Sequence, residues 1–279
     1  MRELAIGERK IKTELPAFVM GIVNVTPDSF YEKSRGGSEH ARKLIDEGAC
    51  ILDLGGESSR PGSAYVSAEE EMGRLLPVIK EIRKISDIPI SVDTRKYEVM
   101  KACCDCGADI LNDISALEDD EKLARFCAET KIPVILMHKR GNPDSMQKNT
   151  EYKDVFGEVN SYLMSRVEYA LGQGIAREKI WLDAGIGFGK NLAGNMELMR
   201  RCSEIGGGEF PLVMALSRKT CIGELTGRAV EDRLAGTLAA NLLCVEKGAA
   251  VIRVHDVKES VDSLKVLAAF CGTSDRNLL

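Results

Sequence analysis

The chain has 279 residues, of which 44% are hydrophobic and 29% are charged, and its formal net charge is −5. This composition is rich enough to bury a core, and the acidic balance argues against nucleic acid as a partner. The amino-terminal sequence MRELAIGERKIKTEL lacks the apolar segment of a secretory signal, and no apolar run reaches the ~18 residues of a membrane span. We therefore expect a cytoplasmic protein with no membrane association and with reduced cysteines.

Eight short apolar runs recur along the chain, and each is followed by a stretch with apolar residues at helical spacing. The runs begin at Phe18, Cys50, Ile88, Ala108, Ile132, Ile180, Phe210 and Ala249. Near-continuous apolar strands are typical of parallel sheets buried on both faces. Eight βα units in a chain of this length favour an α/β fold of one domain, a closed (β/α)8 TIM barrel over residues 1–279. An open, doubly wound sheet is the alternative on pattern alone.

Two local signals place helices between these strands. The segment from Ala68 to Ile85 carries one apolar stripe and is predicted to be a helix. The phrases EGA, CGA and KGA precede the second, fourth and eighth strands, and their glycines are Gly48, Gly107 and Gly248. Glycine at that point suits the left-handed residue that follows a helix C-terminus.

Most of the predicted strands end in polar residues. These are Asn24, Asp53, Glu57, Asp93, Asn112, Asp113, His138, Asp183, Ser217, Arg218, Lys219, Arg253, His255 and Asp256. In a barrel these ends meet on one face, where the active site lies in essentially every characterised example. Any single one can be a simple helix cap, as Asp93 before Thr94 illustrates. Caps need no arginine, lysine or histidine, so the whole set favours an active site.

The residue types in this set fit a flat polar heterocycle joined to a phosphate. Asp93, Asn112 and Asp183 carry carboxylate and amide groups that can pair with an amino group beside a ring N–H. The side chains suited to phosphate oxygens are those of Arg60, Lys219, Arg253 and His255. Asn24 offers a neutral oxygen of the kind that a phosphate-bound Mg2+ accepts. These residues alone do not identify the heterocycle.

Two other patterns invite different chemistry. The segment Gly185 to Lys190 is one residue too short for the phosphate-binding GxxxxGK motif. We interpret it as a flexible loop that lets a flat ligand approach the backbone, with Phe188 beside it, and a plain turn is the alternative. Ser217 and Lys219 are close enough in sequence to make contact, but no GxSxG elbow surrounds the serine, which argues against covalent catalysis.

The sequence resembles the dihydropteroate synthases, which bind pterins, from about Phe18 to Phe270. The matching motifs, in order, are GIVNVTPDSF from Gly21, DLGGESSRPG from Asp53, SVDT from Ser91, LNDI from Leu111, LMH and GNPDSMQ from Leu136, DAGIGFGK from Asp183, ALSRK from Ala215, GTLAA from Gly236 and IRVHDV from Ile252. Nine ordered motifs at compatible spacing make the resemblance specific. It implies a transferase of folate biosynthesis that joins 6-hydroxymethyl-7,8-dihydropterin pyrophosphate to p-aminobenzoate, uses Mg2+ and is inhibited by sulfonamides.

The resemblance also implies a role for each matching position. The pterin ring would be held by Asp93, Asn112, Met137, Asp183 and Lys219. The pyrophosphate would be bound by Asn24, Arg60, Arg253 and His255, with Asn24 also binding the metal. The p-aminobenzoate and sulfonamide pocket would be lined by Ser59, Arg60, Pro61, Phe188, Ser217 and Lys219. The implied catalytic set is Asp183, Lys219, Arg253 and His255, acting in a dissociative substitution through a pterin carbocation.

Three positions depart from the family pattern. The first loop, from Phe30 to Gly37, is a few residues short and lacks an evident aspartate after its serine. Ser59 stands where threonine is usual, and Ala184 replaces a usual proline, which loosens one backbone angle beside Asp183. These departures bear on loop closure and turnover more than on the identity of the ligands.

Three alternative functions stay open at this point. A pterin-dependent methyltransferase, which passes a methyl group to a corrinoid protein, would share the pterin pocket but has no reason to keep Arg60 with Ser217 to Lys219. A non-catalytic pterin-binding protein would account for the altered first loop. A barrel enzyme acting on another phosphate ester fits the strand ends but not the motifs.

The resemblance further suggests a homodimer built on the last helices. Apolar residues that could form its interface are Leu238, Leu242, Leu243 and Val245. The same residues could equally belong to the core, so the sequence does not decide the oligomeric state.

Overall fold

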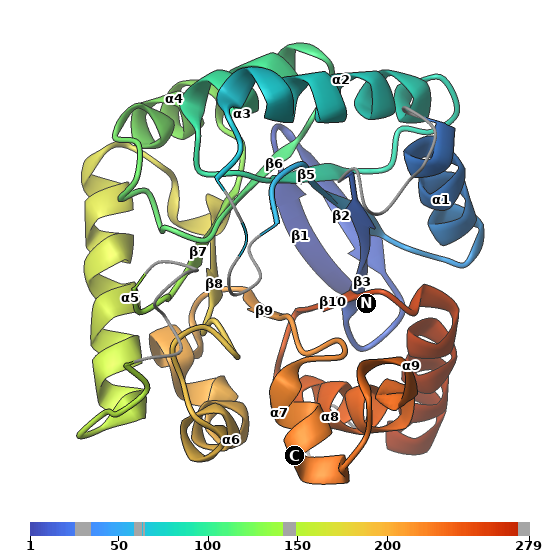
Figure 1. The fold of residues 1–279 in the computed structure, drawn as a ribbon, viewed down its shortest axis with the longest axis vertical. Coiled ribbons are helices and arrows are strands. Elements are labelled where there is room, and N and C mark those ends of the chain that lie inside the picture. The colour runs from blue at the N-terminus through green and yellow to red at the C-terminus, as the bar shows by residue number, and fades with distance from the viewer. Residues whose placement is uncertain (26–34, 59–62, 64, 142–148, 273–279) are drawn as a thin grey trace.

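The structure, a computed structural model, describes residues 1–25, 35–58, 63, 65–141 and 149–272. Eight parallel strands close into a barrel in the order β10-β3-β4-β5-β6-β7-β8-β9 (Figure 1). The strands are β3 (Phe18–Asn24), β4 (Ile51–Gly55), β5 (Ile90–Asp93), β6 (Ile110–Asp113), β7 (Val134–Met137), β8 (Ile180–Asp183), β9 (Leu212–Met214) and β10 (Val251–Val254). They fall within the eight predicted runs, so the closed barrel is confirmed and the open sheet is wrong.

Helices follow the strands and surround the barrel (Figure 1). They are α1 (Arg35–Asp46), α2 (Ala68–Arg83), α3 (Tyr97–Asp105), α4 (Lys122–Thr130), α5 (Val155–Gly172), α6 (Leu192–Arg200), α7 (Thr220–Thr226), α8 (Leu234–Glu246) and α9 (Val257–Cys271). Short 3-10 helices are η2 (Arg177–Lys179), η3 (Cys202–Gly208) and η4 (Val230–Asp232). None of the helices in the described ranges has the length and apolar character needed to cross a membrane.

The predicted helix signals are present in the structure. Helix α2 begins after Ser67, whose side chain accepts a hydrogen bond from the Glu70 N–H at 3.2 Å, and it ends two residues before the predicted end. Gly48, Gly107 and Gly248 have φ values of 99°, 105° and 108°, so all three adopt the left-handed conformation. Each thereby lets the chain turn from a helix into the next barrel strand.

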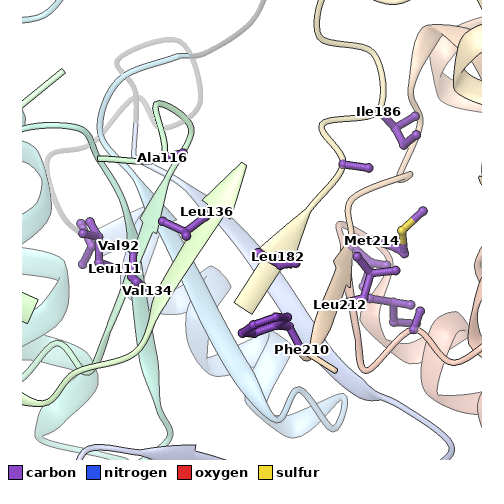
Figure 2. Close-up of a cluster of buried hydrophobic side chains, with 14 of the residues drawn as sticks. Val92, Leu111, Ala116, Val134, Leu136, Leu182, Ile186, Phe210, Leu212 and Met214 are labelled. Carbon is purple, nitrogen blue, oxygen red and sulfur yellow. The ribbon is translucent and has the colours of Figure 1, made fainter. Parts of the chain in front are cut away.

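Side chains of the strands alternate between the barrel interior and the layer of helices. The outward residues pack in one large cluster with the helices, and Figure 2 shows Val92, Leu111 and Val134, which lie in register on β5, β6 and β7. The inward apolar residues form a separate cluster: Phe18, Met20, Ile51, Ile110, Ile135, Trp181, Val213 and Val251. Burial on both faces explains why the strand sequences are almost uninterruptedly apolar.

An amino-terminal hairpin, which the sequence analysis did not predict, packs against the inward cluster. Strands β1 (Arg2–Ile6) and β2 (Arg9–Thr13) pair antiparallel, and Figure 1 shows the hairpin lying across the barrel. Leu4 and Ile6 are 5% and 1% exposed and join the cluster that contains Trp181. The inward apolar residues stand at or near the amino ends of their strands, so the hairpin covers that end of the barrel and leaves the carboxyl ends for the site.

Candidate active site at the carboxyl ends of the barrel strands

The alternation that places apolar residues inside the barrel also places the predicted site residues inside it. Counting in steps of two along each strand, Met20 leads to Asn24, Ile51 to Asp53 and Ile110 to Asn112. By the same count, Trp181 leads to Asp183 and Val251 to Arg253. The interior therefore changes from apolar to polar toward the carboxyl ends, which is where barrel active sites lie.

Arg253 connects the polar residues of three strands. Its Nε donates to Asp53 Oδ2 at 2.6 Å, and its second terminal nitrogen donates to Asp93 Oδ2 at 3.0 Å. The Nδ2 of Asn112 lies 3.3 Å from both carboxylate oxygens of Asp53. One cation thus faces two carboxylates in a site where Asp53 has no exposed surface.

Burial dominates the electrostatics of this cluster. It raises the pKa of Asp93 to about 7, although the Arg253 guanidinium acts in the opposite direction. Burial also opposes the charge on Arg253, but Asp53 and Asp93 outweigh it and raise the pKa of Arg253 further above its ordinary value. A permanent cation therefore lies beside a carboxyl group that can hold a proton near neutral pH.

Asp183 and Lys219 form a second part of the site, across the barrel mouth from β5. Asp183 Oδ1 accepts the Gly185 N–H at 2.7 Å, and burial raises the pKa of Asp183 while that N–H and Lys219 lower it. The Lys219 ammonium donates to the Ile186 carbonyl at 2.7 Å and lies 4.2 Å from the centre of the Phe188 ring. Burial lowers the pKa of Lys219 to about 8, with Asp183 opposing the shift.

Ser217 and Lys219 do not contact each other as a nucleophile pair would. Ser217 Oγ lies 3.0 Å from His255 Nδ1 and accepts the His255 backbone N–H at 3.2 Å. The intervening Arg218 is left-handed, with φ of 56°, and pairs with Asp256 through two hydrogen bonds of 3.0 and 2.7 Å. The segments after β9 and β10 are thus joined, so Ser217, Lys219 and His255 lie on one rim.

The other predicted residues are placed less fully. Asn24 is half-buried at the end of β3, opposite Gly55, and Met137 is 3% exposed at the end of β7, opposite Asp183. Ser59, Arg60 and Pro61 lie outside the described residues, as does most of the altered first loop. Their roles stay predictions from the sequence.

Two residues belong to the site although the sequence analysis gave them no role there. Asp53 was recognised only as a strand end, yet it accepts hydrogen bonds from both Arg253 and Asn112. An acid inside the apolar run CILDLGG was the signal for it. Lys190, 3% exposed, is buried at the end of the glycine-rich loop, and only its position in a failed nucleotide motif had drawn attention to it.

Comparisons with known proteins show the family to which the chain belongs. A family model described as pterin binding enzyme matches residues 20–255. The dihydropteroate synthase of Escherichia coli (strain K12) is 46% identical over 256 residues, covering 90% of this chain and 90% of the relative. That of Bacillus subtilis (strain 168) is 41% identical over 256 residues, covering 90% and 87%.

Solved structures give the same result. The dihydropteroate synthase of Yersinia pestis with a sulfonamide drug complex superimposes with a TM-score of 0.91 at 37% identity, covering 96% of this chain and 99% of the other. That of Xanthomonas albilineans with 4-aminobenzoic acid gives 0.89 at 40% identity, covering 97% and 98%. The fold and site thus define a (β/α)8-barrel enzyme. The chain belongs to the pterin-binding enzyme family, and the relatives described above are dihydropteroate synthases.

Proposed function

We propose that this enzyme condenses 6-hydroxymethyl-7,8-dihydropterin pyrophosphate with p-aminobenzoate to give 7,8-dihydropteroate and pyrophosphate. The observation that carries the proposal is the convergence of carboxyl and amide groups with two cations inside one barrel mouth. Asp93 and Asn112 lie on the side of Arg253, and Asp183 lies on the side of Lys219. Such a site suits a heterocycle with ring N–H and amino donors that carries an anionic leaving group.

The pterin ring belongs in the deepest part of this mouth. Asp183 and Asp93 supply acceptors for the N–H donors of the ring, and the Asn112 amide supplies both a donor and an acceptor. Met137, at the end of β7, packs against one face of the pterin ring. Asp53 orients Arg253 and Asn112 rather than the ring, since it already accepts hydrogen bonds from both.

The pyrophosphate group belongs toward the rim, beside Arg253 and His255, with Arg60 from the loop after β4. The described residues contain no group of three or more His, Cys, Asp or Glu side chains that could hold a metal ion. A Mg2+ ion bound to pyrophosphate needs no such cage, because phosphate oxygens and water fill most of its ligand positions. Asn24, half-buried and on the inward side of β3, fits as its one protein ligand. Bound Mg2+ would neutralise charge on the departing pyrophosphate.

The p-aminobenzoate belongs in the outer part of the site. Phe188 offers a ring face, while Ser217 and Lys219 offer hydrogen-bond donors to a carboxylate. Ser59, Arg60 and Pro61 complete this pocket in the proposal. A relative bound to 4-aminobenzoic acid and another in a sulfonamide complex support binding of both kinds of ligand here.

The proposed reaction is a dissociative substitution. The bond between the pterin methylene carbon and the pyrophosphate oxygen breaks, and the electron pair leaves with pyrophosphate, whose charge Arg253 and His255 stabilise. The buried Asp183 carboxylate stabilises the positive charge that develops on the pterin. The amine of p-aminobenzoate then bonds to the methylene carbon and loses a proton to solvent. No covalent bond to the enzyme forms.

The test is pyrophosphate release with Mg2+, measured with and without p-aminobenzoate, for the wild type, Asp183→Asn and Asp105→Asn. Asp105 is an exposed residue of α3 and serves as a matched control. We expect release that depends on p-aminobenzoate and falls about 100-fold in Asp183→Asn, equivalent to about 3 kcal/mol. Pterin binding without release would favour a non-catalytic binding protein, and transfer of a methyl group instead would favour a methyltransferase.

We also propose that the enzyme is a homodimer that associates through its last helices. Val245 is buried in the core and Leu238 and Leu242 are half-buried, whereas Leu243 on α8 is 60% exposed. Helix α9 adds Val266 and Phe270, which are 69% and 87% exposed. These large apolar side chains support a protein contact on this face.

A further inference from the structure

A second lysine is buried close to the candidate site and is bonded only to backbone carbonyls among the described residues. Lys190 is 3% exposed. Its ammonium donates to the carbonyl oxygens of Gly185 at 2.8 Å, Phe188 at 2.9 Å and His138 at 3.3 Å. An ammonium has three N–H donors, so these carbonyls use all of them. Burial lowers the pKa of Lys190 to about 7, and the nearby Asp183 carboxylate opposes that shift.

These three carbonyls belong to two different loops. His138 follows β7, whereas Gly185 and Phe188 lie in the loop of residues 184–191 that connects β8 with α6. A Cβ atom on Gly185 would lie 1.9 Å from the His138 carbonyl oxygen, so the two backbones are in direct contact. Ile186 packs in the core, and the Gly187 N–H donates to Asn195 Oδ1 at 2.8 Å. Lys190 adds the bonds that join the Gly185 and Phe188 carbonyls to that of His138.

The loop also contains two groups that contact Lys219. The Ile186 carbonyl accepts from the Lys219 ammonium at 2.7 Å, and the Phe188 ring lies 4.2 Å from the same nitrogen. In the chain, Gly185 immediately precedes Ile186, and Phe188 carries the ring. Lys190 thus bonds the carbonyls of Gly185 and Phe188, which are the two ends of the short segment that contacts Lys219.

We propose that Lys190 is a positioning residue, which holds this loop in the shape that presents the Ile186 carbonyl and the Phe188 ring to Lys219. It does not touch substrate. The inference deepens the proposed function, because Phe188 and Lys219 line the proposed p-aminobenzoate pocket. Loss of the Lys190 ammonium removes this donor from the His138 and Phe188 carbonyls and leaves the Gly185 carbonyl with the Phe188 N–H at 3.1 Å. The loop then shifts to satisfy the carbonyls that lost their donor.

The test compares Lys190→Met and Lys190→Gln with Lys179→Met. Methionine is similar in length and apolar, and glutamine retains two N–H donors. Lys179 is a matched control, because it is 8% exposed and donates to a backbone carbonyl, that of Gly7, in the amino-terminal hairpin. The measurements are KM for p-aminobenzoate, the Kd of a sulfonamide and the thermal unfolding midpoint of each variant.

We expect Lys190→Met to raise both KM for p-aminobenzoate and the sulfonamide Kd about tenfold, with Lys190→Gln in between. Lys179→Met should lower the unfolding midpoint but leave both constants within twofold, because loss of folded protein reduces the apparent kcat and not KM. Unchanged constants in folded Lys190→Met, or an equal rise in Lys179→Met, would overturn the inference. If the methionine variant does not fold, the same comparison is made with glutamine.

Failure of the positioning role can be distinguished from failure of the proposed function. If the wild type releases no pyrophosphate with p-aminobenzoate, the proposed function fails whatever the variants do. If the wild type is active and binds the sulfonamide but Lys190 variants do so equally well, only the positioning role fails. Amide hydrogen exchange at Gly187 and Phe188 gives an independent readout, since the proposal requires faster exchange there in Lys190→Met.

Discussion

The buried carboxyl groups of the site are not fully compensated by cations. Arg253 is shared between Asp53 and Asp93, and Lys219 faces Asp183 from a distance while it donates to a carbonyl. Burying these groups costs stability. The arrangement is therefore understandable as a site prepared for a ligand that brings its own donors and anionic charge, and not as a structural ion-pair network.

Asp93 makes this cost measurable. Its pKa is raised to about 7 from an ordinary value of 3.8, so the folded state holds the proton more tightly than the unfolded state. The contribution of Asp93 to stability is thus fully present below about pH 4 and is lost as the pH rises through about 7. We predict that the free energy of unfolding of the wild type, relative to Asp93→Asn, falls between pH 4 and 7 and then levels off.

Urea unfolding of both proteins across this pH range checks the prediction, with Asp105→Asn as an exposed control. A difference between wild type and Asp93→Asn that stays constant, or grows with pH, would show that Arg253 and not burial controls this carboxyl group.

The residues of the site were predictable where a polar side chain interrupts an apolar strand. Asp93, Asn112, Asp183 and Arg253 were all recognised in this way, and the barrel brings them together. The sequence could not show that Arg253 pairs with Asp53 and Asp93, because that pairing joins strands up to 200 residues apart. It also could not reveal Lys190 as a buried group, since a lysine in a glycine-rich loop is usually exposed.

The loop after β8 depends on the left-handed backbone conformation of Gly185. Gly185 has φ of 65°, and its missing Cβ leaves room for the His138 carbonyl. We predict that Gly185→Ala destabilises the fold by more than about 2 kcal/mol and lowers activity, because it adds both strain and a clash. Denaturant unfolding measures the first effect and pyrophosphate release the second.

Gly73 is the matched control for this substitution. It lies inside α2, where an added Cβ has no heavy atom within 4 Å. Gly73→Ala should therefore stabilise the protein by about 0.5–1 kcal/mol. Equal effects of the two substitutions would mean that the loop tolerates a different shape.

Elements were predictable to the extent that their burial imposes a pattern. All eight barrel strands were located within two residues of their first residue, because strands buried on both faces are continuously apolar. The hairpin of β1 and β2 was missed because RELAI and RKIKT contain only one buried face each. Short mixed segments of that kind give no distinctive periodicity.

The proposed association of two chains can be tested by placing a charge on the exposed face of α8. Leu243→Glu should convert a dimer into monomers, because it places a charge on the proposed apolar face. Ile85→Glu is the control, since Ile85 is also exposed, at 42%, and follows α2 on another side of the barrel. Sedimentation velocity distinguishes the species. A wild type that sediments as a monomer, or a Leu243→Glu variant that remains dimeric, would contradict the proposal.

The fold of the whole molecule followed from the order of the elements, since eight βα units have few other ways to bury their strands. The complete site did not follow in the same way. The loop after β4, with Ser59 to Pro61, and the altered first loop carry polar residues without a buried pattern. A role for these two loops in substrate binding stays a prediction from the motifs.

The most direct test of the proposed reaction is to follow product formation with both substrates and Mg2+. The wild-type protein is incubated with the dihydropterin pyrophosphate and p-aminobenzoate, and 7,8-dihydropteroate and pyrophosphate are quantified by mass spectrometry and by a pyrophosphate assay. We predict equal amounts of the two products, formed only when both substrates are present. Binding of the pterin with neither product formed would contradict it and would leave a pterin-binding protein that has lost the chemistry.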